Sequence, residues 1–571
     1  MFKLKRKVIQ CLTYQQWIRN NEPNKDDLLQ QVLVAETFVY KPLISIITPV
    51  WNTPIEILEE TIISVTEQTY SKWELCIADG NSNAETQKLL KIWAKKDSRI
   101  KIKFLDKNKG IVENTNEALS LAKGEFIAFL DHDDLLAPFA LFEILKKLQD
   151  NPKANVFYSD EDKIRQNGRR FDAFFKPDFS PDYLRSLNYM THFMVIQKKL
   201  GDEIGWLQEG CDGAQDYDLI LRATEKSREI VHIPQILYHW RVSSESTASA
   251  ANAKPYANIS GKKALQDHLK RGGHPAQVED GYSSTWYRAQ YQHAIMPLIS
   301  IIISPSNHTL NAEKTINSIL KKTAYPNYEI ILIENKNMEK KETKLYKQIA
   351  QGNRIDTVKW EGSSNYSSAN NKAVEQTKGE VLLFLDDAIQ VINQDWLEEM
   401  LQFVLRSDVG AVGAKLYYPD DTIQHGGLIL GIDNLVRYSH KHFPKNSTGY
   451  FGQLVLAHNI SALPASCLMV RKQVFQEVGG FNKNYSLAFG DIDLSLKILE
   501  KKYLNVWTPY AKLYHHKSKK RDHKTITKKE NRFAKEKAYF EQQWADFLEK
   551  GDPYYNPNLT LDREDFSIAL K

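Results

Sequence analysis

The pattern of hydrophobic and polar residues occurs twice along this chain. An apolar, strand-like segment at residues 43–49 returns at 298–305, and the segment 123–131 returns at 378–386. Both pairs are separated by the same 255 residues. Because a constant offset over more than eighty residues is the signature of an internal repeat, the pattern predicts two copies of one domain.

Short apolar runs in the first copy alternate with segments of helical period. Strands are predicted at 43–48, 74–78 and 126–130, and the last two end at Asp79 and Asp131. Strands that alternate with helices form a mainly parallel sheet, in which ligands bind at the carboxyl ends of the strands. Both aspartates are therefore predicted at the ligand-binding edge.

One helix start after the first strand is predicted in detail. Thr53 is expected to cap the helix, Pro54 to be its first residue and Glu56 to complete a capping box. The apolar positions that follow share one helical face: Leu58, Ile62 and Val65.

The whole pattern predicts an α/β protein with two tandem domains, each built on a mainly parallel sheet, and helical extensions at both ends. The periodicity loosens between the copies and becomes basic and helical after the second. The predicted divisions are an extension at 1–40, a first domain at 41–248, a connector at 249–296, a second domain at 297–520 and a tail at 521–571.

Composition agrees with two ordinary globular domains. The chain has 571 residues, 42% hydrophobic and 26% charged, so each copy has the size of a single α/β domain. A net charge of +5 is too mild to predict a nucleic-acid partner. The four cysteines are far apart and show neither disulfide nor zinc spacing, which is typical of a reducing, cytoplasmic setting.

Membrane signals are weak. No apolar run approaches the ~18 residues of a membrane span, and the basic start at 3–7 has no apolar stretch or cleavage site behind it. We therefore expect a cytoplasmic protein. The basic start beside apolar residues would also suit peripheral contact with an anionic membrane surface, although a solvated helix end is the favoured interpretation. Nothing in the sequence indicates an oligomeric state.

The strongest chemical signal in the first copy is the segment 131–134, with the sequence Asp-His-Asp-Asp directly after a predicted strand. Asp131 and Asp133 are separated by one residue and could share a divalent cation that also holds a diphosphate, since Mg²⁺ and Mn²⁺ prefer oxygen ligands. A solvated acidic loop is the structural alternative.

Three further features favour the metal interpretation. Asp79 ends the neighbouring strand, where a carboxylate could bind a nucleotide base or ribose. Asp216 lies near a helix start, which favours its ionised form, and could take a proton from a hydroxyl group. His239 could complete a metal shell and Arg241 could pair with diphosphate. Taken singly, Asp216 could be a helix cap and His239 a packed histidine.

As a set, these motifs resemble the family 2 glycosyltransferases of bacterial surface polysaccharides, which have the GT-A fold. The resemblance covers nearly all of the first copy. It rests on Ile46 to Asn52, Asp79, Asn114 to Ala118, Asp131 to Asp134, Tyr158 to Asp162, Lys176 to Asp178, Gln215 to Leu219 and His239 to Arg241.

The resemblance implies a nucleotide-diphospho-sugar donor, usually UDP or dTDP, and displacement with inversion onto a growing, lipid-linked glycan. It implies that Asp79 binds the base, Asp131 the ribose or metal, Asp133 and His239 the metal, and that Asp216 is the general base. A cation would offset charge on the leaving diphosphate while one carboxylate activates the acceptor. Two further residues could contact the donor sugar or acceptor, or simply pack: Tyr189 and His192.

The second copy departs from the first at one decisive position. The equivalent pairs are Asp79 and Glu334, Asn116 and Asn371, Asp131 and Asp386, Asp133 and Ala388, Asp216 and Asp491, and His239 and His515. The last two pairs are further apart, which implies about twenty inserted residues. The second copy thus keeps a base candidate, a histidine and a nucleotide-side carboxylate, but Ala388 provides no metal ligand.

Three hypotheses follow for the second copy. In the first, Asp386 and Asp387, with His515, hold a cation in shifted geometry. In the second, Lys517, with Lys519 and Arg521, neutralises the diphosphate without a cation. In the third, the domain binds glycan without transferring sugar. The second copy is then either a second transferase or a glycan-binding scaffold.

Two other classes of nucleotide-binding enzyme fit poorly. A nucleotide-sugar pyrophosphorylase needs a glycine-rich, arginine-containing loop after its first strand, and residues 50–54 have neither. A dinucleotide enzyme needs the Gly-x-Gly-x-x-Gly turn, which follows no candidate strand.

Overall fold

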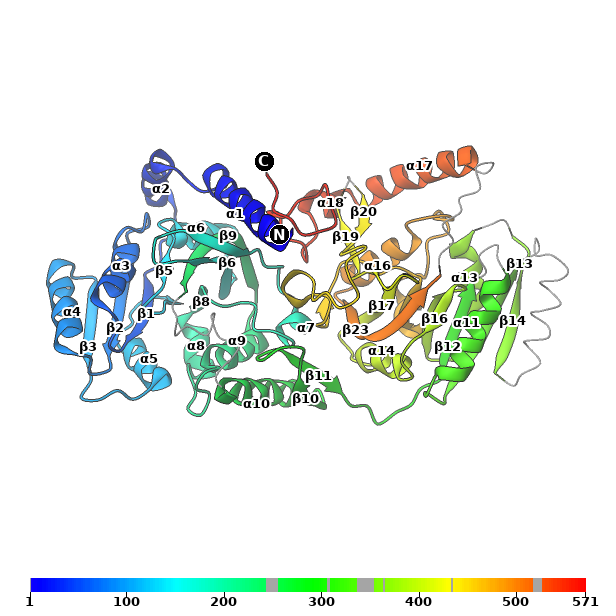
Figure 1. The fold of residues 1–571 in the computed structure, drawn as a ribbon, viewed down its shortest axis with the longest axis horizontal. Coiled ribbons are helices and arrows are strands. Elements are labelled where there is room, and N and C mark those ends of the chain that lie inside the picture. Colours follow the sequence, from blue (N-terminus) through cyan, green and yellow to red (C-terminus); the bar gives the residue numbers. More distant parts are fainter. Residues whose placement is uncertain are drawn as a thin grey trace.

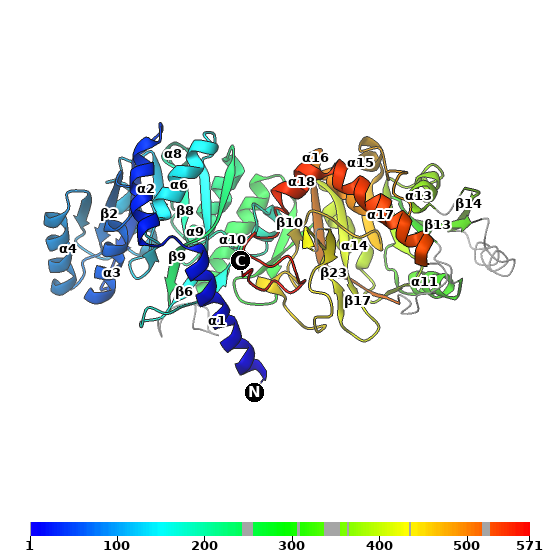
Figure 2. The ribbon, with the colours of Figure 1, turned by 90° about the horizontal axis from the view of Figure 1, so that it is seen from above.

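The structure is a computed structural model that describes residues 2–242, 255–304, 309–335, 354–362, 365–432, 435–516 and 526–570. Two lobes, each built on its own sheet, lie side by side along the long axis (Figure 1). The C-terminal segment lies at their junction in both views, and α17 lies across the second lobe (Figure 2).

The first sheet has nine strands, ordered β3-β2-β1-β4-β8-β6-β9-β5 with β7 paired to β6. Strands β1 to β4 pair in parallel, as do β6 and β9, whereas β5, β7 and β8 are antiparallel to their neighbours. The strands are β1 Ile44–Val50, β2 Trp73–Asp79, β3 Ile100–Phe104, β4 Phe126–Phe129, β5 Leu135–Leu136, β6 Val156–Ile164, β7 Arg170–Phe174, β8 Met194–Gln197 and β9 Ile230–Arg241.

The helices of the first lobe cover this sheet, and α1 and α2 precede its first strand in the chain. They are α1 Phe2–Asn21, α2 Lys25–Thr37, α3 Ile55–Thr66, α4 Ala84–Lys96, α5 Ile111–Leu119, α6 Ala140–Asp150, α7 Pro181–Leu184, α8 Lys198–Ile204, α9 Gln215–Lys226 and α10 Pro255–Arg271. All seven residues of β1 are buried, as expected of a central parallel strand between two layers of helix.

The second sheet repeats the first strand for strand, in the order β14-β13-β12-β15-β22-β17-β23-β16. Its strands are β12 Ile299–Ser304, β13 Tyr328–Asn335, β14 Ile355–Trp360, β15 Val381–Asp386, β16 Ile389–Val391, β17 Val409–Tyr417, β22 Cys467–Arg471 and β23 Leu504–His515. The register also repeats, since Ile44 pairs with Trp73 and Phe126 as Ile299 pairs with Tyr328 and Val381. The predicted duplication and α/β fold class are confirmed.

The second lobe carries additional elements around the same core. Its helices are α11 Thr309–Lys322, α13 Tyr366–Val374, α14 Trp396–Val404, α15 Lys472–Glu477, α16 Gly490–Glu500, α17 Ile526–Gln543 and α18 Ala545–Lys550, with a 3-10 turn at Tyr450–Gly452. The second lobe also contains the short strands β18 Ile423–His425, β19 Leu428–Leu430, β20 Val436–Tyr438 and β21 His458–Asn459. Strand β18 pairs with β17 as β7 pairs with β6.

The helix after β1 differs at its start from the prediction. Helix α3 begins at Ile55, Pro54 is its cap, and no side chain caps it. The hydroxyl of Thr53 instead lies 2.9 Å from Nδ1 of His132, a contact across 79 residues that local pattern does not reveal. The predicted apolar face of the helix is buried.

The segment 249–296, where the sequence pattern loosens, contains regular structure. Helix α10 packs on α9 through one buried face, and the hairpin of β10 Ala276–Asp280 and β11 Tyr287–Tyr291 follows it. Tyr287 of the hairpin stacks on Tyr217 of α9, with ring centroids 5.8 Å apart. This part of the segment therefore packs as an extension of the first lobe.

Buried polar and aromatic contacts join the two lobes. Asp182 forms an ion pair with Arg406, and Oδ1 of Asn459 accepts hydrogen bonds from Ser180 Oγ at 3.0 Å and Asp182 N at 2.9 Å. Beside them, the rings of Phe174 and Phe451 stack at 3.7 Å. Buried charges are destabilising unless paired, so these contacts hold the lobes in one arrangement.

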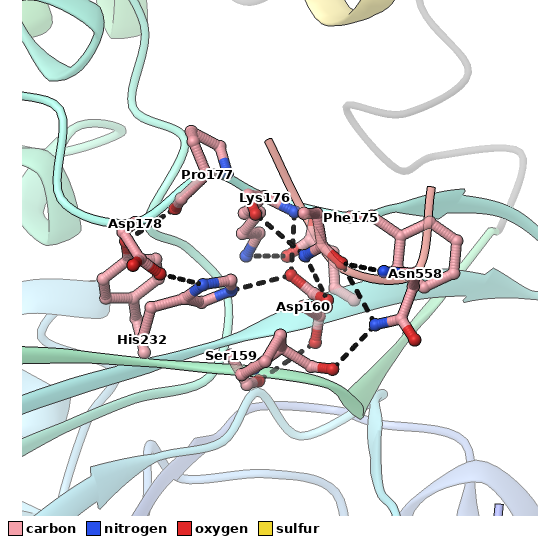
Figure 3. A network of polar contacts seen from close by, with 12 residues as sticks. Ser159, Asp160, Phe175, Lys176, Pro177, Asp178, His232 and Asn558 are labelled. Atoms are coloured by element: carbon pink, nitrogen blue, oxygen red, sulfur yellow. Dashed lines mark hydrogen bonds and ion pairs between the residues drawn. The ribbon is translucent and has the colours of Figure 1, made fainter. Parts of the chain in front are cut away.

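The C-terminal tail reinforces this junction (Figure 3). The buried carboxylate of Asp160 accepts hydrogen bonds from the backbone N of Lys176 at 2.8 Å and Nδ2 of Asn556 at 2.9 Å, and lies 2.9 Å from Nε2 of His232. Asp552 of the tail accepts bonds from the second lobe. The tail thus bonds to both lobes at once.

None of the described helices combines the length and the apolar character needed to cross a membrane.

Replacing Asn556 by Ala should destabilise the junction. The change removes the donors to Asp160 Oδ2 and to the Lys176 carbonyl and leaves a buried carboxylate under-satisfied, so we expect a loss of about 1–3 kcal/mol of unfolding free energy. Calorimetric or denaturant unfolding would measure it. Asn484→Ala, which removes one exposed hydrogen bond to Tyr539, is the matched control and should change stability by less than ~0.5 kcal/mol. Equal effects of the two changes would contradict this account of the tail.

Candidate functional site

The strand ends of the first lobe converge on a small cavity of about 70 Å³. Asp131 follows β4, Asp216 lies in the first turn of α9, and His192 lies two residues before β8. All three line the cavity, so the structure brings together the predicted nucleotide-side carboxylate and the predicted base.

The two carboxylates of this cavity influence each other. Burial raises the pKa of Asp216 above its usual range, the charge of Asp131 adds to the effect, and His192 opposes it. Removal from bulk water and the neighbouring Asp133 likewise raise the pKa of Asp131. One hydrogen bond orients the base candidate, from Asn188 Nδ2 to Asp216 Oδ2 at 3.2 Å.

His192 supplies the positive charge between these acids. Its Nδ1 lies 3.0 Å from Glu161 Oε2, and Glu161 also pairs with Lys176 at 3.1 Å. Burial alone would lower the pKa of His192, but Glu161, followed by Asp134 and Asp131, raises it to about 9. The sequence offered His192 only as a sugar contact or a packed residue, because its charge depends on Glu161, 31 positions away.

The predicted base-binding residue lies at the carboxyl end of β2. Asp79 is fully buried, and its two carboxylate oxygens lie 3.2 and 3.3 Å from the backbone N–H of Ser82. The equivalent Glu334 lies in β13 opposite Lys359 of β14 and is partly exposed. Contact of either residue with a nucleotide remains a prediction.

The aspartates of the acidic segment after β4 have different partners. Asp134 is buried and accepts hydrogen bonds from Tyr238 Oη at 2.6 Å and from the backbone N of Arg241 at 2.7 Å. Arg241 donates from Nε to the Asp133 carbonyl at 2.7 Å and pairs with Glu60 at 2.6 Å. Arg241 therefore braces the loop that presents Asp133, and its predicted contact with diphosphate remains untested.

His239 lies inside β9, opposite Leu135 of β5. Its Nδ1 lies 2.7 Å from Oδ1 of the buried Asp162. Asp162 is held in turn by Arg170 and by the hydroxyl of Tyr14 in α1. A carboxylate that holds one ring nitrogen of a histidine orients the other toward a metal or substrate. The N-terminal helix thus supports a predicted site residue, a role that only the fold reveals.

Within the described ranges, no three His, Cys, Asp or Glu side chains come together as a metal-binding group. Mg²⁺ and Mn²⁺ sites in nucleotide enzymes commonly use one or two carboxylates, with substrate phosphates and waters as the other ligands. Asp131 lines the cavity, whereas Asp133 and His239 are not among its lining residues, so a cation held by these three residues remains a prediction.

The second lobe contains a cavity of about 840 Å³ at the equivalent place. Asp386, Asp491 and His515 line it. The counterparts of the two aspartates, Asp131 and Asp216, line the first cavity, whereas the counterpart of His515, His239, does not. The rest of the lining is partly aromatic, with Tyr366, Tyr438, Tyr485, Phe489 and Phe533.

The ionisable side chains that line the second cavity are more numerous than those of the first, and they are Asp386, Arg437, Lys441, Asp491, His515 and Glu564. His515 is buried, its Nδ1 lies 2.9 Å from Gln424 Oε1, and its Nε2 lies 3.4 Å from Asp386 Oδ1. Asp386 is about a third exposed, at 35%, whereas the adjacent Asp387 is fully buried and does not line the cavity. A cation shared by Asp386, Asp387 and His515 remains a prediction.

Strand register identifies a second difference between the copies. Ala128 pairs with Val195 in the first sheet, and Leu383 pairs with Met469 in the second. Counting back along the two strands places Ser466 where the first copy has His192. The second copy therefore lacks both the second carboxylate, at Ala388, and the cationic imidazole.

Helix α17 supports the base loop of the second copy. The carboxylate of Glu536 accepts hydrogen bonds from the backbone N of Ser486, Leu487 and Ala488. The next residue, Phe489, has a left-handed backbone with φ of 64°, and its ring stacks on Phe540 of α17 at 4.9 Å. Asp491 follows within the first turn of α16, so the C-terminal helix helps to present this aspartate.

One predicted site residue, Lys517, lies outside the described residues, as do Lys519 and Arg521. Their predicted contact with diphosphate therefore remains a prediction from sequence.

Comparison with known proteins agrees with this picture. The family model described as glycosyl transferase family 2 matches residues 45–204 and 300–479, one match in each lobe. The chain therefore belongs to glycosyl transferase family 2, as a tandem member. Of the motifs that suggested this family, those between Ile46 and Asp178 lie in the first matched region, whereas Gln215 to Leu219 and His239 to Arg241 lie beyond it.

Two curated relatives align with most of the chain. The uncharacterized protein y4gI of Sinorhizobium fredii is 41% identical over 92% of the chain and 59% of its own length. The O-antigen biosynthesis protein RfbC of Myxococcus xanthus is 33% identical over 97% of the chain and 43% of its own length. The chain thus spans about half the length of these relatives. Among solved structures, S. aureus TarS 1-349 in complex with UDP-GlcNAc is 19% identical, with a TM-score of 0.33 over 40% of this chain and 66% of TarS 1-349.

The charge on His192 can be measured by imidazole NMR, with its signal assigned from a His192→Gln variant. We expect a protonated ring at neutral pH and a midpoint near pH 9. Glu161→Gln should lower that midpoint by about one unit or more because it removes the main favourable charge. Since the folded pKa lies above the unfolded value of ~6.5, the ion pair stabilises the fold fully below that pH and loses this contribution as pH rises through about 9.

Glu113→Gln, which neutralises an exposed carboxylate in α5, is the control and should leave the midpoint unchanged. A wild-type midpoint near 6.5, or no response to Glu161→Gln, would contradict the assignment of a charged His192.

Proposed function

We propose that this chain is an inverting glycosyltransferase that moves a sugar from a UDP- or dTDP-sugar to a hydroxyl of a growing, lipid-linked surface glycan. One observation carries the proposal: Asp131, Asp216 and His192 line the same cavity at the carboxyl ends of the first sheet. That edge is where nucleotide ligands bind in open α/β sheets.

In the proposed mechanism, Asp216 acts as the base. Its raised pKa makes the carboxylate a better proton acceptor, and its hydrogen bond to Asn188 sets its direction. It would take the proton of the acceptor hydroxyl as that oxygen attacks the anomeric carbon. A single displacement requires no second carboxylate as a nucleophile, which agrees with inversion.

The donor would lie along the strand ends, with its base near Asp79 and its diphosphate near Asp131 and Asp133. These two aspartates, with His239, would hold Mn²⁺ or Mg²⁺. When bound, the cation neutralises charge on the departing diphosphate. His192 would add a positive charge to the cavity that it lines together with Asp131.

The nature of the acceptor is supported by the relatives and by the charge of the chain. RfbC of Myxococcus xanthus is named for O-antigen biosynthesis, so we propose a surface glycan as the product. The proposed acceptor is lipid-linked at the cytoplasmic face of the membrane, where the basic residues of 3–7 would favour peripheral contact.

The second lobe has two candidate functions. Asp386, Asp491 and His515 line one large cavity, which supports a second transferase. Ala388 and Ser466, in place of a carboxylate and an imidazole, together with the aromatic lining, support a glycan-binding module that holds the product for the first lobe.

Asp216→Asn tests the first site. Because general bases contribute a factor of roughly 10²–10⁴, the variant should lose sugar transfer by that factor while it retains UDP affinity. A panel of nucleotide-sugars with Mn²⁺ or with chelator would measure both the donor and the cation requirement. Asp212→Asn, an exposed change four residues away, should leave transfer unchanged. Intact transfer in Asp216→Asn would rule out this base.

Asp491→Asn tests the second site on the same donor panel. If the second lobe is a transferase, one sugar should be lost in this variant and a different sugar in Asp216→Asn. If it is a binding module, transfer by the first lobe persists and the affinity for the glycan acceptor falls. Unchanged transfer of every sugar together with unchanged acceptor affinity would contradict both functions.

A further inference from the structure

A second cavity of the C-terminal lobe, of about 490 Å³, is lined by basic residues. It lies between α11 and β16, which are neighbours in Figure 1. Lys314, Lys321 and Lys322 of α11 line it, together with Gln390 of β16 and His516. No aspartate or glutamate of the described chain is among its lining residues.

This basic cavity is distinct from the candidate active site. The large cavity of the same lobe is lined by Asp386, Asp491 and His515, and the two cavities share no lining residue. They are close in sequence, because Ala388 lines the basic cavity two positions after Asp386. The site is therefore not assigned by the proposed transfer reaction.

The first lobe shows that this basic character is specific to the second copy. Thr61 of α3 donates its hydroxyl to the carbonyl of His132, and Thr315 of α11 donates to the equivalent carbonyl of Asp387. Counting from these threonines, Lys314 occupies the position of Glu60 and Lys321 the position of Glu67. Two acidic positions on one helical face have become lysines.

The consequence for charge is large. In the first lobe, Glu60 forms an ion pair with Arg241 at 2.6 Å, which leaves little net charge at this place. In the second lobe, Lys314 and Lys321 are exposed, and neither forms an ion pair with a residue of the described chain. Like charges that lie close together without acidic partners repel each other, and an anion relieves that repulsion.

The cavity also has fixed elements that would orient a ligand. Lys322 donates from Nζ to the Val391 carbonyl at 2.9 Å, which holds its stem against β16. Nε2 of His516 lies 2.9 Å from Gln390 Oε1, so both side chains are placed at the rim. Two exposed ammonium groups, those of Lys314 and Lys321, lie beside these fixed side chains and suit an anion with several oxygen atoms.

We propose that this basic cavity binds a phosphate group carried by a ligand other than the sugar donor. Lysine ammonium groups bind phosphate as point charges, and hydroxyl and amide groups such as Asn317 can add hydrogen bonds. The phosphate could belong to the headgroup of a membrane lipid or to a soluble phosphorylated compound. The site does not depend on the proposed transferase activity of either lobe.

Charge-reversal variants of the full chain test this site. Lys314→Glu with Lys321→Glu gives α11 the residues that the first copy has at these positions, Glu60 in α3 and Glu67 at its C-terminal cap. Lys88→Glu with Lys95→Glu in α4 is the matched control, with the same charge change, the same spacing of seven residues and exposed side chains. Thermal unfolding of each variant would show that the fold is retained; Lys314→Gln with Lys321→Gln serves if the reversal unfolds the chain.

Two probes distinguish the sources of phosphate. Inorganic pyrophosphate, titrated calorimetrically in the presence of chelator, reports a soluble ligand. Vesicles of phosphatidylcholine with about a third of phosphatidylglycerol, compared with phosphatidylcholine alone, report a lipid headgroup.

We expect the wild type to bind at least one probe and the α11 variant to bind it more weakly, on the order of tenfold or more, with the α4 control unchanged. Binding should also weaken as salt is added, because surface charges are screened. Binding of pyrophosphate alone would identify a soluble source, and binding of vesicles would identify a headgroup. Wild-type binding of neither probe, or equal binding by the wild type and the α11 variant, would overturn the proposal, as would an equal loss in the α4 control.

Discussion

Three consecutive carboxylates on β6 organise the first lobe and its connection to the rest of the molecule. Asp160 bonds to the C-terminal tail and His232, Glu161 pairs with His192 and Lys176, and Asp162 holds His239 and Tyr14. A buried carboxylate without donors is strongly destabilising, so each of these acids requires its partners to stay in place. One strand therefore couples the junction of the lobes, the charged imidazole of the cavity and the predicted metal-side histidine.

The second copy has no counterpart of these three consecutive carboxylates. The equivalent end of β17 carries Lys415, Leu416 and Tyr417, and none of them is acidic. Without those acids, a buried imidazolium at the position of His192 would have no counter-charge, and Ser466 stands there instead. Ala388 is thus one of several linked differences. The two copies differ in the whole set of charged residues around the site, and not at one position alone.

The features that the sequence predicts well are those set by local pattern. The buried strand β1, the apolar face of α3 and the strand-end position of Asp131 all follow from the hydrophobic periodicity and from the turn residues that bound each element. Strand β3 was not predicted, because it is an edge strand with only its first residue buried. The roles of Glu161 for His192, of Tyr14 for Asp162 and of the tail for Asp160 join residues 31, 148 and 396 positions apart, which no local pattern encodes.

The two cavities differ in a way that gives the rigid junction a purpose. The first has a volume of about 70 Å³, and its ionisable lining consists of Asp131, His192 and Asp216. The second has a volume of about 840 Å³ and combines ionisable side chains with several aromatic rings. Aromatic faces suit the apolar faces of sugar rings, whereas proton transfer requires close, oriented charges. Because the buried Asp182 and Arg406 pair and the tail fix the lobes relative to each other, a glycan held in the second cavity would lie at a constant distance from Asp216. Under either proposed function of the second lobe, successive transfer or a binding scaffold, that constant distance would keep the glycan in reach of the first cavity.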